Sequence, residues 1–179
     1  FDNRLTINAN IKGAYTKDQY DPGVVASASS FDPTQTPYDP NNTTFGGYFE
    51  YSLPQSPRNP VSFIEQQQDF GKSFRNIGNI EFDYKLNDFV PGLSAKVNLG
   101  FDINNGERER FQPTTLSRPP FTNYTGEIRR ENFNRTNTLL DAYLNYNRSL
   151  GTDHRVDFTA GYSYQDFSSE FPSFRAFNL

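Results

Sequence analysis

Apolar and polar residues alternate along five stretches of the chain. These stretches are residues 4–15, 73–86, 93–103, 138–147 and 156–165. A period of two is typical of β-strands, because successive side chains of a strand point to opposite faces of the sheet. The alternation therefore predicts an all-β fold in which every strand has one apolar face and one polar face.

The predicted strands are long, and the segments between them alternate between long and short. Each strand has about 10–14 residues, whereas a strand in a soluble protein usually has ~5–6 and one that crosses a bilayer needs ~9–11. Residues 16–72 and 104–137 are long connections, and 87–92 and 148–155 are short ones. Outer-membrane barrels combine short periplasmic turns with long extracellular loops. The pattern predicts a segment of a transmembrane antiparallel β-barrel, with the long connections and residues 168–179 outside the cell.

The two faces of these strands would meet different surroundings in a barrel. We expect lipid to contact the apolar face at Leu5, Ile7, Ile11, Ile80, Phe82, Val97, Leu99, Leu140, Leu144, Val156 and Phe158. We expect the polar face to line the lumen with Arg4, Asn8, Lys12, Arg75, Asn79, Glu81, Asp83, Lys96, Asn98, Asp102, Asp141, Asn145, Asp157 and Gln165. The lumen set mixes both signs of charge, which suits a water-filled or protein-contacting wall better than an ion-selective ring.

Aromatic residues lie near both ends of the apolar faces. Tyr15, Phe74 and Tyr164 are at one end, and Tyr84 and Tyr146 are at the other. Membrane barrels carry two aromatic girdles at the membrane interfaces. Aromatic residues at strand ends also occur in soluble cores, so this feature supports the barrel without deciding it.

Proline and glycine mark the first long connection as loop with local structure of its own. All twelve Pro residues fall outside the five predicted strands, as expected because Pro cannot donate to a sheet ladder. Asn59 followed by Pro60 predicts a helix N-cap and one or two helical turns. Gly46 and Gly47 predict a turn.

Composition excludes several classes of function. Hydrophobic residues make up 34% of the 179 residues, yet there are 18 Phe and 11 Tyr, and disordered chains are usually poor in aromatic residues. The net charge of −4 argues against a nucleic-acid partner. With no Cys and one His, we expect no disulfide, no thiolate zinc site, no multi-His metal site and no cofactor. No apolar run is long enough for a transmembrane helix. The chain begins at Phe1 and has no Met, which predicts an internal part of a longer protein.

A few residues could carry chemistry, and each has a simpler explanation. His154 follows Asp153, as in a catalytic triad, but it falls in a short turn, where a solvated residue is expected. The acidic residues of the polar face could act as an acid and base pair, but lining a lumen explains them better. A calcium site could use oxygen ligands from Asp21, Asp32, Asp39 and Asn41. Their spacing fits no EF-hand, and Asp-Pro pairs are ordinary in turns. We therefore expect no enzyme activity and no metal site.

Aromatic residues of the long connections are the better candidates for contacting a ligand or a partner. They are Phe45, Tyr48, Phe49, Tyr51, Phe111, Phe121, Tyr124 and Phe133. The alternative is that they pack the loops against one another. Arginines in the second connection could clamp a carboxylate, but exposed pairs with neighbouring glutamates explain them better. The arginines are Arg108, Arg110, Arg129, Arg130 and Arg135, and the glutamates are Glu107, Glu109, Glu127 and Glu131.

Several short motifs, in the same order along the chain, resemble the SusC/RagA-like TonB-dependent outer-membrane transporters of Bacteroidota. The matching stretches are Ser30–Thr34, Asn59–Glu65, Asn76–Asn79, Tyr84–Leu86, Pro91–Leu93, Leu99–Asp102, Asp153–Val156 and Ala160–Phe167. They are similar to the family's "SFDPT" and "NP…E" loop segments, its "IGN…Y" strand, its "PGL" turn, its "LGYD" strand, and its "DH" turn with "AGYSYQEF" strand. Each motif is weak alone, and the combination is fairly specific.

The resemblance implies that the whole chain, residues 1–179, is part of a TonB-dependent receptor barrel of about 22 strands. The plug and the TonB-contacting segment would lie outside this sequence. The family implies a location in the outer membrane of a Gram-negative cell, as a multi-pass β-barrel. It also implies a SusD-like surface lipoprotein over the loops, and TonB as an energy-supplying partner. The imported nutrient would be an oligosaccharide or a peptide.

Two other classes of function remain open. The first alternative is a secreted β-rich carbohydrate-binding or adhesin module, in which the apolar face would pack in a protein core. The second is an outer-membrane enzyme, which the scarcity of reactive residue types disfavours.

Overall fold

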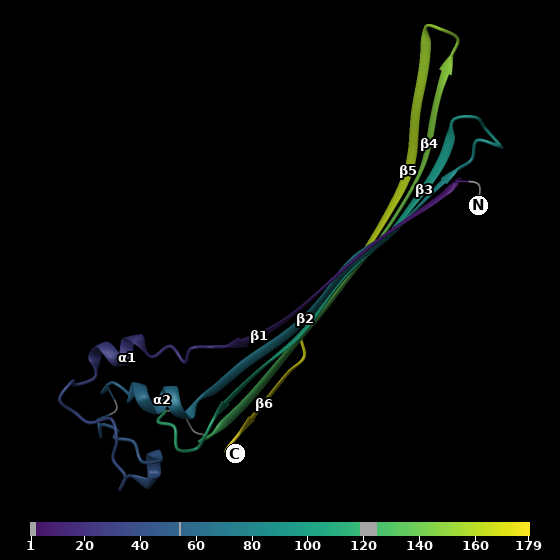
Figure 1. Cartoon of the computed structure of the whole chain (residues 1–179). Coiled ribbons are helices and arrows are strands. Elements are labelled where there is room, and N and C mark those ends of the chain that lie inside the picture. Colours follow the sequence, from purple (N-terminus) through teal and green to yellow (C-terminus); the bar gives the residue numbers. More distant parts are fainter. Residues whose placement is uncertain (1–2, 54, 119–124) are drawn as a thin grey trace. The chain divides into compact units, whose positions relative to one another are not determined.

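The computed structural model describes residues 3–53, 55–118 and 125–179 (Figure 1). The chain forms two compact units. One, here called the sheet unit, comprises Phe1–Tyr15, Phe74–Asn105 and Phe133–Glu170. The other, here called the loop unit, comprises Thr16–Ser73, Gly106–Asn132 and Phe171–Leu179.

The described residues form one six-stranded sheet. The strands are β1 (Leu5–Gln19), β2 (Gln68–Lys85), β3 (Leu93–Gln112), β4 (Glu127–Leu150), β5 (His154–Glu170) and β6 (Ser173–Phe177). Strands β1 to β5 are neighbours in chain order, and β6 pairs with β4. Both β5 and β6 run antiparallel to β4. The expected consecutive pairing of five strands, including the pairing of the first with the second, is confirmed.

The strands extend well beyond the ranges that alternation predicts. Strand β3 continues to Gln112 and β4 begins at Glu127, so the expectation of one long loop over 104–137 is wrong. The predicted 57-residue connection is shortened in the same way, because β1 ends at Gln19 and β2 begins at Gln68. In these extensions charged residues occupy both faces, so the sequence loses its apolar and polar contrast. Cross-strand ion pairs hold the extensions together where apolar packing is absent.

Residues 168–179 also differ from the open-ended loop that we expected. Strand β5 continues to Glu170, and β6 then pairs with β4. The pairing of Glu131 with Ser173 continues, without offset, the register that pairs Asn134 with Glu170. The two strands are thus one strand interrupted at Phe171 and Pro172, where proline has no N–H to donate.

Two tight turns close the hairpins at the short connections, as predicted. Between β2 and β3, Gly92 has φ +89°, and its N–H donates to the Asn87 side chain over 3.0 Å. A Cβ at Gly92 would collide with the backbone oxygen of Asn147. Between β4 and β5, Gly151 has φ +73° with open space around it. Only glycine adopts such angles without strain.

Two short helices and one 3-10 turn lie in the connection between β1 and β2. They are α1 (Val25–Ser30), η1 (Thr43–Phe45) and α2 (Pro60–Gln66). The predicted cap of α2 is confirmed, since the Asn59 side chain accepts from the backbone N–H groups of Val61 and Ser62. Among the described residues, none of the helices has the length and hydropathy needed to span a membrane.

Neither face of the sheet is covered by a core in the described part of the chain. Leu116 is the buried hydrophobic residue there, at 3% exposure, whereas Ile7, Ile11 and Phe158 are 55%, 66% and 62% exposed. A soluble two-layer fold would bury these side chains, because exposed apolar surface is costly in water. The described residues by themselves do not form the protein core that the secreted alternative requires.

Candidate functional site

Side chains on the polar face of the sheet unit hydrogen-bond from strand to strand. Glu81 on β2 accepts from the Asn8 amide at 3.4 Å and pairs with the Lys96 ammonium at 3.0 Å. Arg75 forms two hydrogen bonds with the Asp102 carboxylate, at 2.9 and 2.7 Å. These contacts place residues of β1, β2 and β3 on one common face, as the alternation predicts.

The same face continues over β4 and β5. The Ser163 hydroxyl donates to Asp141 at 2.6 Å, and the Thr159 hydroxyl donates to Asn145 at 3.0 Å. Near the turn, Asp157 accepts from the side chains of Asn147 and Arg155. Asp83, the remaining acidic residue expected on this face, is half-buried on β2, two residues beyond Glu81. The lining of a lumen by this face stays a prediction.

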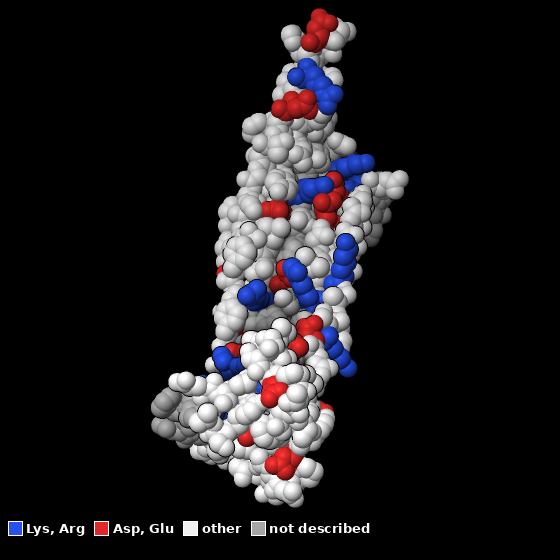
Figure 2. Space-filling model, turned by 90° about the vertical axis from the view of Figure 1, so that its left-hand side faces the viewer, with Lys and Arg blue, Asp and Glu red and all other residues white. Residues whose placement is uncertain are grey.

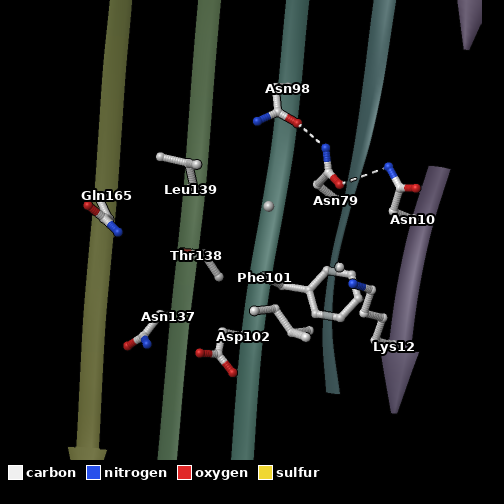
Figure 3. Close-up of a pocket in the computed structure, with 13 residues that line it drawn as sticks. Asn10, Lys12, Asn79, Asn98, Phe101, Asp102, Asn137, Thr138, Leu139 and Gln165 are labelled. Carbon is white, nitrogen blue, oxygen red and sulfur yellow. Dashed lines mark hydrogen bonds between the residues drawn. The ribbon is translucent and has the colours of Figure 1, made fainter. Parts of the chain in front are cut away.

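A hollow of about 660 Å³ opens on this face, with lining residues from each of the strands β1 to β5 (Figure 3). Its wall includes a row of amides, in which Asn10 donates to Asn79 at 3.3 Å and Asn79 donates to Asn98 at 2.8 Å. Gly100 also lines the hollow, and it packs closely against β4. A Cβ at this position would lie 3.3 Å from the Cβ of Leu139.

The chemistry of this hollow is mixed. The lining comprises Asn10, Lys12, Ile77, Gly78, Asn79, Asn98, Gly100, Phe101, Asp102, Asn137, Thr138, Leu139 and Gln165. Amides both donate and accept hydrogen bonds, and the aliphatic and aromatic groups offer apolar contact. The volume lies within the range of ~300–1,000 Å³ that is usual for ligand pockets. Such a lining can hold hydroxyl-rich or peptide-like groups.

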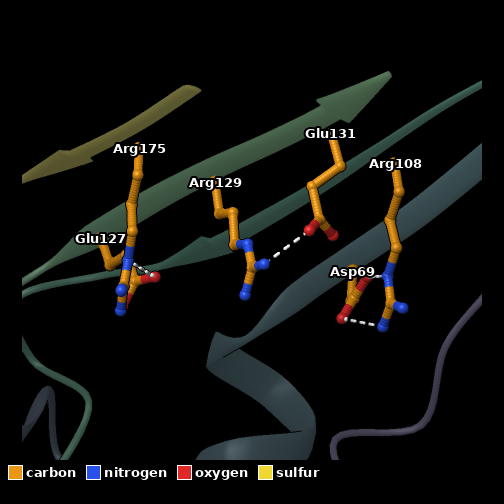
Figure 4. A network of polar contacts seen from close by, with 6 residues as sticks. All are labelled: Asp69, Arg108, Glu127, Arg129, Glu131 and Arg175. Carbon is orange, nitrogen blue, oxygen red and sulfur yellow. Dashed lines mark hydrogen bonds and ion pairs between the residues drawn. The ribbon is translucent and has the colours of Figure 1, made fainter. Parts of the chain in front are cut away.

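In the loop unit, a row of ion pairs lies along the strand extensions, and two of the pairs join neighbouring strands (Figure 4). Arg108 on β3 donates to both carboxylate oxygens of Asp69 on β2, at 2.7 and 2.9 Å. Asp69 is only 4% exposed, and the guanidinium lies 3.8 Å from the centroid of the Tyr20 ring. Gly71 leaves space for this ring, since a Cβ there would lie 3.0 Å from it. The hydrogen bond from Arg108 to Asp69 raises the pKa of Arg108 above its ordinary value.

A second part of this row surrounds Glu127, which is 6% exposed. Its carboxylate pairs with Arg175 of β6 at 2.7 Å and with Arg118 at 3.4 Å. Beside it, Arg129 pairs with Glu131 at 2.5 Å. Buried carboxylates with bidentate or multiple arginine partners are geometrically specific, so these contacts fix the register of the strand extensions.

Several of these arginine contacts were predicted and others were not. The exposed pairs of Arg130 with Glu109 and of Arg129 with Glu131 are confirmed. Arg108 pairs instead with a buried aspartate, and Glu127 is buried instead of exposed. Sequence reasoning overlooked both because it treated these segments as loops. A continued two-residue period on β3 would have placed Arg108 on the same face as Asp102.

Glu65 of α2 organises the connection between β1 and β2. Its carboxylate accepts from the Tyr38 hydroxyl at 3.0 Å and from the Tyr48 hydroxyl at 2.5 Å. The hydrogen bond to Glu65 raises the pKa of Tyr48 to about 12. Nearby, burial raises the pKa of Glu50, an effect opposed by hydrogen bonds and by the charge of Arg58.

The predicted contact residues of the loops have different surroundings. Phe49 and Tyr51 form edge-to-face contacts with each other and with Phe31, at centroid distances of 4.9–6.4 Å. Phe45, Tyr48, Phe111 and Phe133 are half-buried, the last two on β3 and β4. Phe121 and Tyr124 lie outside the described residues. Loop packing therefore uses part of this aromatic surface, and the contact role remains a prediction.

The residues considered for catalysis or metal binding do not form a site in the described part of the chain. His154 is exposed at the start of β5. The carboxylates of Asp21, Asp32 and Asp39 accept from backbone N–H groups two residues further on, at 2.6, 2.9 and 3.2 Å. These are ordinary Asx turns. No group of three His, Asp or Glu side chains gathers there as a metal site requires.

Comparison with known proteins identifies relatives by sequence. No protein-family model matches the chain. It is 33% identical over 147 residues to the TonB-dependent receptor P3 of Formosa agariphila, a match that covers 82% of this chain and 14% of the relative. It is 27% identical over 207 aligned positions to the TonB-dependent receptor SusC of Bacteroides thetaiotaomicron, covering 95% of this chain and 20% of SusC. The chain thus spans a fifth or less of these relatives.

A solved structure shows the same fold. The structure of the RagAB peptide importer in the "closed-closed" state matches 99% of this chain and 20% of the importer chain, with a TM-score of 0.70 and 17% identity. This likeness confirms the predicted fold class, an antiparallel β-barrel segment. The 33% identity to the receptor P3 over 82% of the chain, with the match to SusC and the ordered motifs, shows that the chain belongs to the SusC/RagA-like TonB-dependent receptors.

Proposed function

We propose that this chain forms part of the wall of an outer-membrane importer of nutrients. The observation that carries the proposal is the two-sided sheet. One face is polar and linked by cross-strand hydrogen bonds, and the other exposes large apolar side chains such as Ile11 and Phe158. Strands with this alternation suit a bilayer on one side and water on the other. The proposal assigns the chain no catalytic step.

The polar face would line the lumen of the importer. Its charged residues are neutralised in pairs, such as Arg75 with Asp102 and Lys96 with Glu81. A wall of neutralised pairs and amides offers many weak hydrogen bonds and no strong field. Such a wall lets a polar oligomer slide past without being trapped, which supports a neutral glycan or a peptide as the cargo.

The importer would work with partners outside this sequence. TonB would supply energy through an N-terminal part of the protein. A SusD-like lipoprotein would cover the connection between β1 and β2, contacting its aromatic residues. The cargo would be a peptide or an oligosaccharide. The RagAB importer is described as a peptide importer, which supports the peptide.

Cysteine labelling tests the two faces directly, because the chain itself has no Cys. In a full-length receptor without other reactive thiols, Asn79→Cys and Ile80→Cys place neighbouring reporters on opposite faces of β2. We expect a membrane-impermeant maleimide to label Asn79→Cys in intact outer membranes, and to label Ile80→Cys only after detergent extraction. Labelling of Ile80→Cys in intact membranes, or recovery of the receptor in the soluble fraction, would contradict the proposal.

Uptake gives the functional test. A strain that lacks the full-length receptor should lose growth on one oligosaccharide or peptide source, and the wild-type copy should restore it. A variant without its TonB-contacting segment should not restore growth. Unchanged growth on every oligomer tested would refute the import role even if the receptor were embedded in the membrane.

A further inference from the structure

One row of side chains crosses the hollow of the polar face from strand to strand. Alternate residues of a strand share a face, so this face carries successive rows that run across the sheet. The amides of Asn10, Asn79 and Asn98 form one such row. The next row, here called the middle row, lies two residues further along each strand. All of its members line the hollow, and in the order of strands β1 to β5 they are Lys12, Ile77, Gly100, Leu139 and Gln165.

The middle row is apolar at its centre, although it belongs to a polar face. Leu139 pairs with Gln165 in the sheet register, and a Cβ at Gly100 would lie 3.3 Å from the Cβ of Leu139. Ile77 is 43% exposed, and exposed apolar surface is costly in water. The two aliphatic side chains break the alternation, and a lumen filled only with water does not explain them.

The neighbouring rows place Ile77 opposite Gly100. On one side runs the row of amides, and on the other Arg75 donates to Asp102. Ile77 and Gly100 lie halfway between these two contacts between β2 and β3. The absent side chain of Gly100 therefore leaves a gap in the row, bordered by Ile77 on one strand and by Leu139 on the next.

Lys12 supplies a cation at the β1 end of the row. Figure 2 shows that, on the face in view, Lys and Arg side chains lie among Asp and Glu side chains. The acidic side chain of the hollow, Asp102, is paired with Arg75 at 2.7 Å. Lys12 takes part in none of the ion pairs among the described residues. In Figure 3 its side chain extends from β1 toward the other lining residues.

The row thus offers a cation, an aliphatic gap and side-chain amides, in this order. Neighbouring strands lie ~4.8 Å apart, so ~10 Å separates the backbones of β1 and β3, and the extended Lys12 side chain covers much of this distance. The carboxyl-terminal residue of a peptide carries its carboxylate and its side chain on one Cα, which fits the remaining span. A neutral oligosaccharide has no anionic group for Lys12, and sugar rings stack on aromatic planes, whereas Ile77 and Leu139 are aliphatic.

We propose that the hollow binds the carboxyl-terminal residue of a cargo peptide in which this residue has an apolar side chain. The Lys12 ammonium pairs with the terminal carboxylate. The apolar side chain fills the gap at Gly100, between Ile77 and Leu139. Amides that border the gap, such as that of Asn98, hydrogen-bond to the peptide backbone, since an amide both donates and accepts. The inference rests on the proposed import function and narrows its cargo to peptides with this ending.

The test measures peptide binding to the purified full-length receptor by isothermal titration calorimetry. The probe is Gly-Gly-Leu, compared with Gly-Gly-Gly and with the C-terminal amide of Gly-Gly-Leu. Burial of the leucine side chain should give about tenfold tighter binding than Gly-Gly-Gly. Gly100→Val fills the gap and should remove this preference, and Leu139→Ala should reduce it. The acid should bind about threefold more tightly than the amide, and Lys12→Gln should remove that difference.

The matched controls change the same face of the sheet outside the hollow. Ser94→Val adds the same branched side chain on β3, and Lys85→Gln removes a cation from β2. Both should bind the three peptides like the wild type. Equal affinity of the wild type for Gly-Gly-Leu and Gly-Gly-Gly would overturn the site. The same loss in Ser94→Val as in Gly100→Val, or in Lys85→Gln as in Lys12→Gln, would also overturn it.

A cysteine reporter shows what occupies the hollow, because the chain itself has no Cys. In a receptor without other reactive thiols, Asn137→Cys should react with a maleimide, and Gly-Gly-Leu should slow the reaction more than Gly-Gly-Gly does. Labelling that is equally slow with and without peptide would mean that another part of the receptor fills the hollow, and the proposal would be wrong. Unchanged growth of the receptor-deficient strain would instead refute the import function, whatever the purified receptor binds.

Discussion

Asn59 is the residue on which the folded connection between β1 and β2 most depends. The side chain is completely buried. Its amide donates to the backbone oxygens of Pro37 at 2.6 Å and Phe49 at 3.0 Å. Its Oδ1 accepts from the backbone N–H groups of Val61 at 3.0 Å and Ser62 at 3.4 Å. One side chain therefore caps α2 and ties it to two distant loop segments.

Replacing Asn59 by Ala removes all four hydrogen bonds. Loss of the N-cap costs ~1 kcal/mol. Each carbonyl left without a partner costs about 1 kcal/mol or more. We expect the free energy of local unfolding of residues 37–67 to fall by about 3 kcal/mol. This corresponds to an opening equilibrium roughly 150-fold larger.

Amide hydrogen exchange of the full-length receptor measures this opening segment by segment. The Asn59→Ala variant should exchange roughly 150-fold faster around α2, with the strands unchanged. The matched control is Asn41→Ala, at an exposed loop position. Asn59→Asp separates the two roles, because Asp caps helices as well as Asn does but cannot donate to the carbonyls. Wild-type protection in Asn59→Asp would refute the argument that the amide donors matter.

Three further changes test other parts of the chain. Gly92→Ala should prevent much of the receptor from folding. The left-handed backbone costs ~1–2 kcal/mol for a residue with a Cβ, and the added Cβ also collides with the backbone oxygen of Asn147 on β4. The intensity of the heat-modifiable folded band on a gel measures the folded fraction. The hydrogen bond between Tyr48 and Glu65 stabilises the loop fully at pH values below 10.0, the ordinary pKa of tyrosine, and this stabilisation is lost as the pH rises through about 12. In the Glu65→Gln variant, the pKa of Tyr48, measured by tyrosinate absorbance, should move back toward 10.0. Leu144→Arg should cost about 2–4 kcal/mol in a bilayer, whereas Asn145→Arg on the polar face should cost far less in the same unfolding assay.

Each of these changes has an outcome that would contradict it. For the turn, the control is Gly151→Ala, which also has a positive φ but open space around it; equal folding yields would show that the collision is irrelevant. For the tyrosine, an unchanged titration in the Glu65→Gln variant would exclude the hydrogen bond as the cause. For the membrane face, equal costs at the two positions would mean that lipid does not contact the apolar side.

The strand extensions show where sequence reasoning reaches its limit. Alternation identified the parts of the strands in which one face is apolar, because the contrast between apolar and polar positions is present there. It missed residues 104–112 and 127–137, where both faces are charged. These segments stay in strand conformation because carboxylates such as Asp69 and Glu127 are buried against arginines from neighbouring strands. No residue within one segment reveals a partner that is tens of residues away.

The loop candidates divide in a similar way. The cap at Asn59 and the turn at Gly46 were predictable, because each depends on residues within one helical turn. The second role of Asn59, as donor to Pro37 and Phe49, depends on how the connection folds back on itself. The same holds for Glu65, which gathers Tyr38 and Tyr48 from another part of the loop.

The sequence by itself determined the fold class, the order of the strands, the two faces and the two short turns. The strands and their faces follow from the period of side chains along the chain, and the turns follow from local backbone geometry. Only the tertiary structure decided how far each strand extends, that β6 continues the register of β5, and which charged side chains are buried. Those features depend on pairing between strands. A hydrogen bond or ion pair across a sheet is set by register, which the side chains of both strands determine together.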